Sequence, residues 1–145
     1  MRKHAFITVL CFLTFYAAAC SSGSASPGTS YFEQLEEENG YLIDAEELAD
    51  RIKSKPDELK IIDIRQHEDY LEGFIPGAEH CWWYDMRDEI GTLPREKTIV
   101  VYCYTGQSSG QIVGVLRTAG FKALSLKGGW FNGWKPYKDA VAGGT

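Results

Sequence analysis

The sequence predicts an α/β protein in which a central parallel β-sheet is flanked by helices on both faces. Short apolar runs rich in β-branched residues alternate with segments whose apolar residues recur at helical spacing, and Gly and Pro separate them. The run at residues 98–102 shows no polar alternation, which is typical of a strand buried on both faces of a parallel sheet. Ligands of such sheets bind where the strands end at their carboxyl edge.

The first elements of the domain follow from local signals. Residues 41–43 are expected to form a short edge strand. Asp44 and Glu47 have the spacing of a capping box and predict a helix that ends before Pro56. Residues 60–64 form the next apolar run, and we expect a strand there.

The middle and the end of the domain continue this alternation. We expect a short helix at residues 66–71, a Pro-Gly turn at 75–78, a strand at 78–82, a helix at 84–90 and a last strand at 123–126. Strands and helices alternating at this spacing predict βαβ units and a parallel sheet.

Cys103 follows the strand at residues 98–102 and precedes an amphipathic helix. The apolar residues expected on the buried face of this helix are Ile112, Val115, Leu116 and Ala119. Ser108 or Ser109 is available as its N-cap, and Gly120 follows its end. The cysteine is therefore expected in a loop between a buried strand and the beginning of a helix.

This position predicts a reactive thiol. A helix N-terminus with several backbone N–H groups aimed at one point lowers the pKa of a thiol, and the thiolate is the nucleophilic form. The same amides can hold an anion. Gly106 and the small residues around it allow the backbone to curl around the side chain. The alternative is that Cys103 is an inert buried thiol that only packs in the core.

Three motifs resemble those of rhodanese-like domains. They are Ile61-Ile-Asp-Ile-Arg65 with Glu68-Asp-Tyr70, Gly73 and Ile75-Pro-Gly-Ala78; then Val100-Val-Tyr-Cys103 with the six-residue loop to Ser108; and finally Leu126-Lys-Gly-Gly-Trp130 through Trp134. The resemblance implies an α/β fold with a central parallel sheet. It also implies a cysteine that takes a sulfane sulfur from a donor such as thiosulfate as a persulfide and passes it to a thiol or cyanide acceptor.

The resemblance also implies the residues of the site. Cys103 is the expected nucleophile, and the persulfide-binding loop is Tyr104, Thr105, Gly106, Gln107, Ser108 and Ser109. The supporting residues are Asp63, Arg65, Lys127 and Trp130. We expect Asp63 and Arg65 to pair with each other or with the loop backbone, and Trp130 to lie near the site because Gly128 and Gly129 permit close backbone approach. No metal or cofactor motif is present, so the expected partners are a small sulfane-sulfur donor and a thiol acceptor.

The sequence departs from the family pattern at two points. Phe74 replaces a histidine beside the Pro-Gly turn, and the loop has Gln107, Ser108 and Ser109 where many members carry an arginine. The serines resemble the loop of single-domain bacterial thiosulfate sulfurtransferases, and anionic donors must then be bound by amides, hydroxyls and Lys127. An alternative is a persulfide carrier, sensor or protein-binding module without turnover.

Related folds with phosphatase or arsenate chemistry place an arginine six positions after the cysteine, where it clamps an oxyanion with a bidentate fork. Ser109 occupies that position here, and a neutral hydroxyl cannot replace the fork. The sequence therefore argues against this chemistry.

The amino terminus resembles a bacterial lipoprotein signal. Arg2 and Lys3 precede an apolar run, which ends in three alanines before Cys20 and is shorter than the roughly 20 residues that span a bilayer. In lipoproteins that cysteine carries the lipid, such as palmitate, so we expect Cys20 to be lipidated and the domain to lie outside the cytoplasm, held to a membrane of the bacterial cell envelope. An ordinary signal peptide or an uncleaved anchor are the alternatives.

The expected organisation is a lipoprotein signal peptide (1–19), a flexible tether (20–39), a rhodanese-like domain (40–140) and a C-terminal tail (141–145). Loss of the two basic residues of the signal moves the formal net charge from −5 to −7. No basic stripe remains to neutralise phosphates, so nucleic acid is not an expected partner.

The remaining cysteine, tryptophan and histidine residues are expected to have structural roles. Cys81 is expected to pack as an apolar residue, with a reversible Cys81–Cys103 bond as the alternative. His67 and His80 are expected to be isolated. The tryptophans expected to pack in the core or at its rim are Trp82, Trp83, Trp130 and Trp134.

Overall fold

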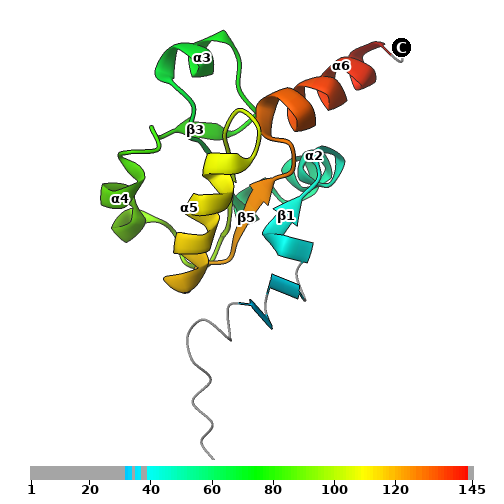
Figure 1. The fold of residues 1–145 in the computed structure, drawn as a ribbon. Helices are drawn as coiled ribbons and strands as arrows, with labels where there is room; N and C mark the ends of the chain where they lie inside the picture. The colour runs from blue at the N-terminus through cyan, green and yellow to red at the C-terminus, as the bar shows by residue number, and fades with distance from the viewer. Residues whose placement is uncertain (1–31, 34, 37–38, 144–145) are drawn as a thin grey trace, which may run out of the picture.

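The computed structural model describes residues 32–33, 35–36 and 39–143, and it contains the parallel sheet that the sequence predicts (Figure 1). The strands are β1 (Leu42–Ile43), β2 (Leu59–Asp63), β3 (Ala78–His80), β4 (Thr98–Tyr102) and β5 (Ala123–Leu126). Their order in the sheet is β1-β5-β4-β2-β3, and every neighbouring pair is parallel. The strand that precedes Cys103 is therefore the central one.

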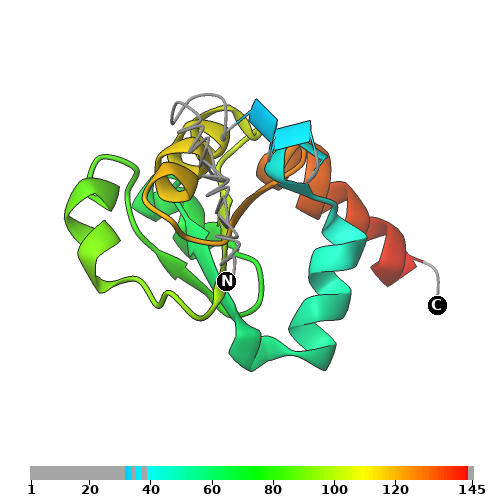
Figure 2. The same ribbon diagram turned by 90° about the horizontal axis from the view of Figure 1, so that it is seen from below.

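Helices cover both faces of the sheet, as expected (Figure 2). The helices of the described part are α2 (Ala45–Ser54), α3 (His67–Glu72), α4 (Met86–Glu89), α5 (Gln107–Thr118) and α6 (Lys135–Gly143), and α3 lies beyond the end of the sheet. A π-helical segment, η4 (Gly129–Trp134), leads into α6. One buried cluster joins the sheet to α4 and α5, and a second joins it to α2 and η4.

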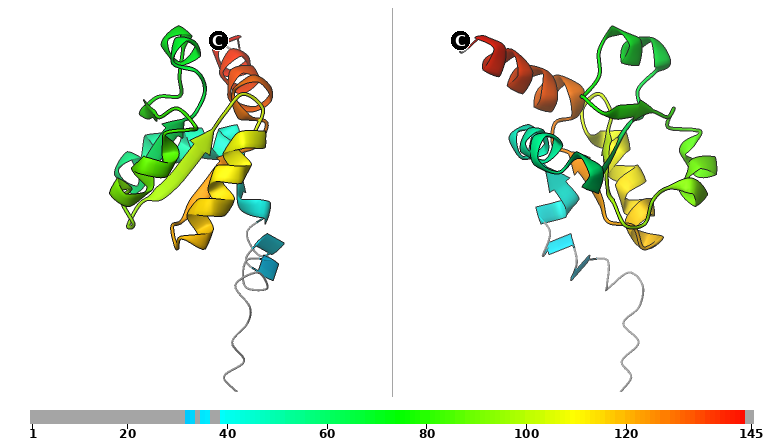
Figure 3. Two further views of the ribbon diagram at one scale, coloured as in Figure 1. Left: turned by 60° about the vertical axis from the view of Figure 1, so that its left-hand side comes forward. Right: turned by 180° about the vertical axis from the view of Figure 1, so that it is seen from behind.

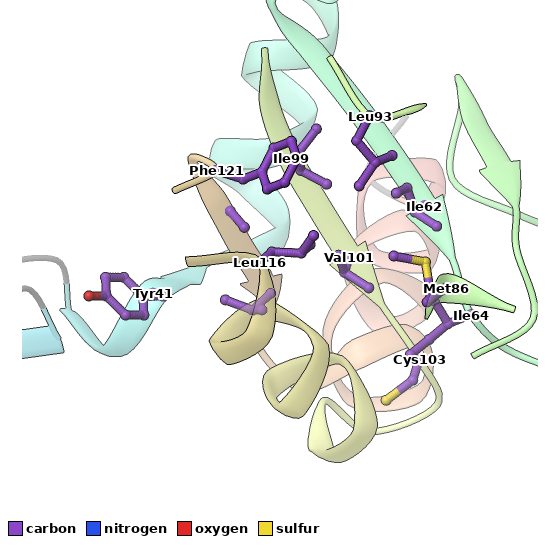
Figure 4. Close-up of a cluster of buried hydrophobic side chains, with 12 residues drawn as sticks. Tyr41, Ile62, Ile64, Met86, Leu93, Ile99, Val101, Cys103, Leu116 and Phe121 are labelled. Atoms are coloured by element: carbon purple, nitrogen blue, oxygen red, sulfur yellow. The ribbon is translucent and has the colours of Figure 1, made fainter. Parts of the chain in front are cut away.

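The central strand β4 is buried on both faces. The side chains from Ile99 to Tyr102 are each 0% exposed. Ile99, Val101 and Cys103 belong to the cluster under α4 and α5 (Figure 4), whereas Val100 and Tyr102 belong to the opposite cluster. Because successive side chains of a strand point to opposite faces, Cys103 is directed to the face that α5 covers.

The start of α5 differs from the prediction. The helix begins at Gln107, and the preceding residue is Gly106 in the left-handed region, with φ of 99° and no side-chain cap. Ser108 and Ser109 are therefore inside the first turn, and the prediction that one of them caps the helix is wrong. The hydroxyl of Ser109 instead contacts the sulfur of Cys103 and the hydroxyl of Ser125.

The buried face of α5 is also rotated from the predicted one. Ser109, Val113 and Leu116 are buried, while Val115 is 53% exposed and Ala119 is exposed as well. The hydrophobic pattern alone favoured a face through Val115. In the structure Ser109 is buried, and Val113 and Leu116, which lie four and seven positions later, are on the same face of the helix.

The predicted capping box at the start of α2 is replaced by ion pairs. Asp44 precedes α2 as predicted but makes no side-chain cap hydrogen bond. Its carboxylate pairs with Lys127, and Glu47 pairs with Arg51, so the capping box is not formed. The expected strand at 78–82 ends at His80, and the expected helix at 84–90 is the shorter α4 followed by a 3-10 turn.

The structure describes residues on both sides of the expected domain limits of 40 and 140. Leu35 packs against the cluster beneath α5, and α6 continues to Gly143. The expected signal peptide and the lipidation site, Cys20, lie outside the described residues. Within the part of the chain that the structure describes, no helix is both long and apolar enough to cross a membrane.

Candidate active site

The candidate site lies at the carboxyl edge of the sheet, where three of the predicted residues follow parallel strands. Arg65 comes two residues after β2, Cys103 directly after β4, and Lys127 directly after β5. The loop between β4 and α5 lies between α3 and the beginning of α6 in both views of Figure 3. The parallel order of the strands thus places residues far apart in sequence at one edge.

The sulfur of Cys103 is held by neutral hydrogen-bond donors. Cys103 is 4% exposed, and its Sγ lies at the end of β4, directed toward the first turn of α5 (Figure 4). The backbone N–H of Gly106 donates to Sγ at 3.2 Å, and the hydroxyl of Ser109 donates at 3.6 Å.

These donors lower the pKa of Cys103. Burial by itself acts to raise the pKa because it disfavours the charged thiolate. The hydrogen bonds from the N–H and hydroxyl of Ser109 and from the N–H groups of Thr105 and Gly106 outweigh that effect, and the pKa lies below the ordinary thiol value. The site therefore favours the nucleophilic form of the sulfur.

Ser125 belongs to this sulfur site, and our sequence analysis missed it. Its Oγ lies 2.8 Å from the Oγ of Ser109, and the two serines are 1% and 0% exposed. If the Ser109 proton points to the sulfur, the hydroxyl of Ser125 is the donor to Ser109, because each hydroxyl has one proton to give. The sequence signal that could have identified it was the position of Ser125 within the otherwise apolar run at residues 123–126.

The segment after β5, which contains Gly129 to Phe131, hydrogen-bonds the backbone of the Cys103 loop. Trp130 donates its backbone N–H to the carbonyl of Cys103 at 2.8 Å, and Phe131 donates to the carbonyl of Tyr104 at 2.9 Å. A Cβ atom at Gly129 would lie 2.6 to 2.8 Å from the Cys103 carbonyl and the amides of Thr105 and Gly106. The predicted close approach of this glycine pair to the site is therefore present.

Asp63 and Arg65 form a buried ion pair beneath this segment. The Asp63 Oδ2 and Arg65 Nη2 atoms are 2.6 Å apart, and the side chains are 0% and 2% exposed. Arg65 also donates to the carbonyl of Gly73 at 2.6 Å, and its guanidinium lies 4.3 Å from the ring centre of Trp130. The pair that the sequence analysis expected thus connects the end of β2 to the segment behind Cys103.

The charge of this arginine is retained despite its burial. Burial acts to lower the pKa of Arg65, but the hydrogen bond and the charge of Asp63 outweigh burial and raise the pKa. Removing one partner of such a pair leaves an uncompensated buried charge, which is strongly destabilising. The pair therefore serves as structural support.

Tyr104 is directed away from the sulfur and fixes the loop to α3. Its hydroxyl donates to the Asp69 carboxylate at 2.5 Å and accepts the backbone N–H of Gln66 at 3.1 Å, while its ring stacks on Phe131. Burial and the Asp69 carboxylate raise the pKa of Tyr104. Asp69 and Phe131 are further site residues that the sequence analysis did not select, because neither belongs to the loop.

The remaining predicted residues lie at the start of α5, after β5 and beside the Pro-Gly turn. Gln107 is exposed at the first position of α5, and Ser108 is half-buried beside it. The ammonium of Lys127 lies 3.4 Å from the carboxylate of Asp44, and both side chains are largely exposed. That Lys127 assists in binding anionic donors stays a prediction. Phe74 stacks on Tyr70 and is 46% exposed.

Cys81 differs from Cys103 in both contacts and acidity. Burial, with the charges of Glu89 and Asp85, raises the pKa of Cys81 to about 11. Both thiols are free. They follow β3 and β4, which flank β2, so their backbones are about 10 Å apart at the usual strand spacing, beyond the span of a disulfide. A Cys81–Cys103 bond requires the backbone to move.

The two histidines are not isolated, in contrast to the prediction. The Nε2 atom of His80 lies 2.8 Å from the carbonyl of Arg65, so this nitrogen carries the proton and donates it. The ring centre of His67 lies 5.0 Å from that of His80, because β3 ends beside the start of α3. Within the described ranges, no group of three or more His, Cys, Asp and Glu residues has the geometry of a metal site.

Comparison with known proteins defines the class of this domain. A family model described as the rhodanese-like domain matches residues 44–136. This match covers most of the chain, and the protein belongs to the rhodanese-like domain family.

Several relatives are named as sulfurtransferases. The chain is 42% identical over 81 residues to a tRNA sulfurtransferase of Desulfurococcus amylolyticus, but it spans 16% of that protein and the match covers 56% of the chain. It is 35% identical over 83 residues to the putative sulfurtransferase YtwF of Bacillus subtilis, covering 55% of the chain and 81% of the relative. It is 33% identical over 89 residues to the thiosulfate sulfurtransferase GlpE of Coxiella burnetii, and this match covers 59% of the chain and 83% of the relative.

Solved structures agree with this fold. A rhodanese-like domain protein from Staphylococcus aureus has a TM-score of 0.58 at 26% identity, covering 64% of this chain and 89% of that one. The Alr3790 protein from Anabaena sp. has a TM-score of 0.60 at 32% identity, and the match covers 66% of this chain and 77% of that one. The rhodanese-like fold and the relationship to sulfurtransferases are thereby established.

Replacing Gly129 should damage the site and the fold together. We expect Gly129→Ala to lower the free energy of unfolding by about 2 kcal/mol or more, because a Cβ there meets loop backbone at a positive φ of 58°. Urea denaturation measures the effect. The matched control is Gly110→Ala, where a Cβ meets nothing within 4 Å and which should stabilise α5 by about 0.5 to 1 kcal/mol. Equal effects of the two substitutions would contradict the packing described.

Removing the hydroxyl of Ser109 should make Cys103 less acidic. We expect Ser109→Ala to raise the pKa of the thiol, because the variant loses one of the donors that stabilise the thiolate. The pH dependence of Cys103 alkylation by iodoacetamide, in a Cys81→Ser background, measures it. The wild-type midpoint should lie below that of an ordinary thiol, and the variant midpoint above the wild-type one. Ser108→Ala is the control, and an identical shift in both variants would refute the role of the Ser109 hydroxyl.

Proposed function

We propose that this protein is a sulfurtransferase that moves sulfane sulfur from a donor such as thiosulfate to a thiol or cyanide acceptor through a persulfide on Cys103. The observation that carries the proposal is the Cys103 sulfur, which has a lowered pKa and a ring of N–H and O–H donors at the end of the central strand. The names of the relatives, among them a thiosulfate sulfurtransferase, support the same reaction class.

The first half of the reaction follows from the chemistry of the thiolate. The Cys103 thiolate attacks the outer sulfur of the donor, a new S–S bond forms, and the old bond of that sulfur breaks. The leaving group, sulfite in the case of thiosulfate, departs with the electron pair of the broken bond. Because the thiol is already acidic, the step needs no separate general base.

The second half returns the enzyme to its starting state. A nucleophilic acceptor, a thiolate or cyanide, attacks the outer sulfur of the persulfide, and the Cys103 thiolate leaves. The N–H groups of Thr105, Gly106 and Ser109 hold negative charge on the cysteine sulfur before attack and on the persulfide after it. The same donors thus serve both halves of the cycle.

We also propose that the domain acts in the bacterial cell envelope, held to a membrane through a lipid on Cys20. The support is the sequence alone, namely the basic start, the short apolar run and the three alanines before the cysteine. Expression of the full chain in a bacterium should give a membrane-bound product whose mature N-terminal cysteine carries acyl chains by mass spectrometry. Cys20→Ala should release it from the membrane fraction or leave it unprocessed. An unmodified Cys20 in the wild-type product would disprove the anchor.

The role of Cys103 is tested by replacing each thiol in turn. Cys103→Ser should abolish cyanolysis activity, a loss of at least 1000-fold, because an alcohol does not ionise at neutral pH and forms no persulfide. Cys81→Ser should keep activity within about twofold, since its thiol has a raised pKa and is not in the loop. Equal turnover in the wild type and Cys103→Ser removes Cys103 from the mechanism. A stable sulfur adduct on Cys103 without turnover, seen by intact mass after exposure to thiosulfate and to polysulfide, identifies a persulfide carrier instead.

A further inference from the structure

One of the donors to the Cys103 sulfur is a side chain, and the backbone does not fix the position of its proton. The N–H of Gly106 is held by the loop, whereas the hydroxyl of Ser109 rotates about single bonds and carries one proton. That proton stabilises a thiolate only while it points to the sulfur, which lies 3.6 Å from the hydroxyl oxygen. The contribution of Ser109 therefore depends on what holds its hydroxyl in place.

Ser125 contacts that hydroxyl from the sheet. Its Oγ lies 2.8 Å from the Oγ of Ser109, and among the described residues Ser109 is the one hydrogen-bond partner of the Ser125 hydroxyl. Ser125 belongs to β5, where it is paired with Leu42 of β1 on one side and with Val101 of β4 on the other. A strand that is held from both sides thus carries this hydroxyl and gives the first turn of α5 a rigid partner.

The protons of the two hydroxyls have one arrangement that serves a thiolate. A thiolate has no proton to give and only accepts hydrogen bonds, and a hydrogen bond to a charged acceptor is stronger than a neutral one. The proton of Ser109 therefore goes to the sulfur, and its oxygen accepts the proton of Ser125. Both O–H dipoles then point toward the sulfur, and each hydrogen bond polarises the next.

Burial makes this pair of hydroxyls effective. Both serines are buried, so water does not compete for their protons. A buried hydroxyl without a partner costs free energy, which favours the arrangement in which each of the two has one. Ser125 is also the one polar residue of β5, whose other residues are alanine and leucine. A position that served packing alone would be expected to carry an apolar side chain as well.

We infer that Ser125 is a positioning residue of the sulfur site, which stabilises the thiolate of Cys103 through the hydroxyl of Ser109 without a hydrogen bond of its own to the sulfur. The inference rests on the proposed function for the use that is made of this thiolate, as the attacking group in the first half of the cycle and the leaving group in the second. Ionisation of Cys103 itself is measured without any sulfur donor.

The pH profile of alkylation by iodoacetamide, followed by mass spectrometry on the peptide that contains Cys103, tests the inference in a Cys81→Ser background. Ser125→Ala should raise the midpoint by at least about 0.3 pH unit, which halves the thiolate fraction well below the midpoint. The rate on the plateau above the midpoint should stay within about twofold, because the thiol is fully ionised there in both proteins. An unchanged or lowered midpoint overturns the inference.

A double-mutant cycle separates an effect through Ser109 from a change in packing. In a Ser109→Ala background, Ser125→Ala should move the midpoint by less than about 0.1 pH unit, because the hydroxyl that it positions is already gone. Equal shifts in both backgrounds mean that Ser125 acts by another route, and the inference is then wrong.

Val113→Ala is the packing control. It removes buried methyl groups, but no hydroxyl, from the cluster that contains Cys103. This variant should unfold at a lower urea concentration and keep the wild-type midpoint of alkylation. A shift of the midpoint as large as that of Ser125→Ala would assign the effect to lost packing and overturn the inference.

Ser125→Thr provides the rescue. Threonine keeps a hydroxyl on its β-carbon, so the midpoint should return to within about 0.1 pH unit of the wild-type value, although the additional buried methyl group lowers the stability of the fold. A threonine variant with the midpoint of the alanine variant contradicts the role of the hydroxyl.

The outcomes also separate this inference from the proposed function. If Ser125→Ala shifts the midpoint as expected and the wild type shows no cyanolysis, the role of Ser125 stands and the sulfurtransferase proposal fails. If the wild type turns over and Ser125→Ala has the wild-type midpoint, the sulfurtransferase proposal stands and the role of Ser125 is wrong.

Discussion

The site depends on the close approach of Gly129 to the backbone of the Cys103 loop. A Cβ at this position would lie 2.6 to 2.8 Å from the carbonyl of Cys103 and the amides of Thr105 and Gly106. Two of these groups belong to the loop that donates hydrogen bonds to the sulfur. The curl of the loop around Cys103 thus depends on Gly129, which lies in the segment that follows β5. The buried Asp63–Arg65 pair supports this segment, because the guanidinium of Arg65 packs against the ring of Trp130.

This construction has a consequence for the electrostatics of the site. The loop between β4 and α5 presents backbone N–H groups to the Cys103 sulfur, and these neutral donors stabilise negative charge on it. Arg65 fixes the scaffold, because its side chain is buried and paired with Asp63.

The sequence predicted the fold well because its signals were local and strong. The bounds of β4 and β5 agree with the predicted runs, since apolar β-branched residues in short runs have one stable arrangement in a parallel sheet. Helix starts were predicted less well. Asp44, Ser108 and Ser109 all have the chemistry of N-caps, yet none makes a side-chain cap hydrogen bond. Lys127 pairs with Asp44, and the hydroxyl of Ser109 contacts the sulfur of Cys103. Tertiary partners outcompete local capping when they are buried or charged.

By itself, the sequence determined that a cysteine follows a buried strand and opens a helix, that the loop lacks charge, and that a glycine pair follows the last strand. These are properties of neighbours along the chain. Only the tertiary structure decided that Ser125 holds Ser109, that Asp69 and Phe131 hold Tyr104, and that Lys127 turns to Asp44. Such contacts join residues that are many positions apart, and strand order and helix rotation, which no local pattern encodes, bring them together.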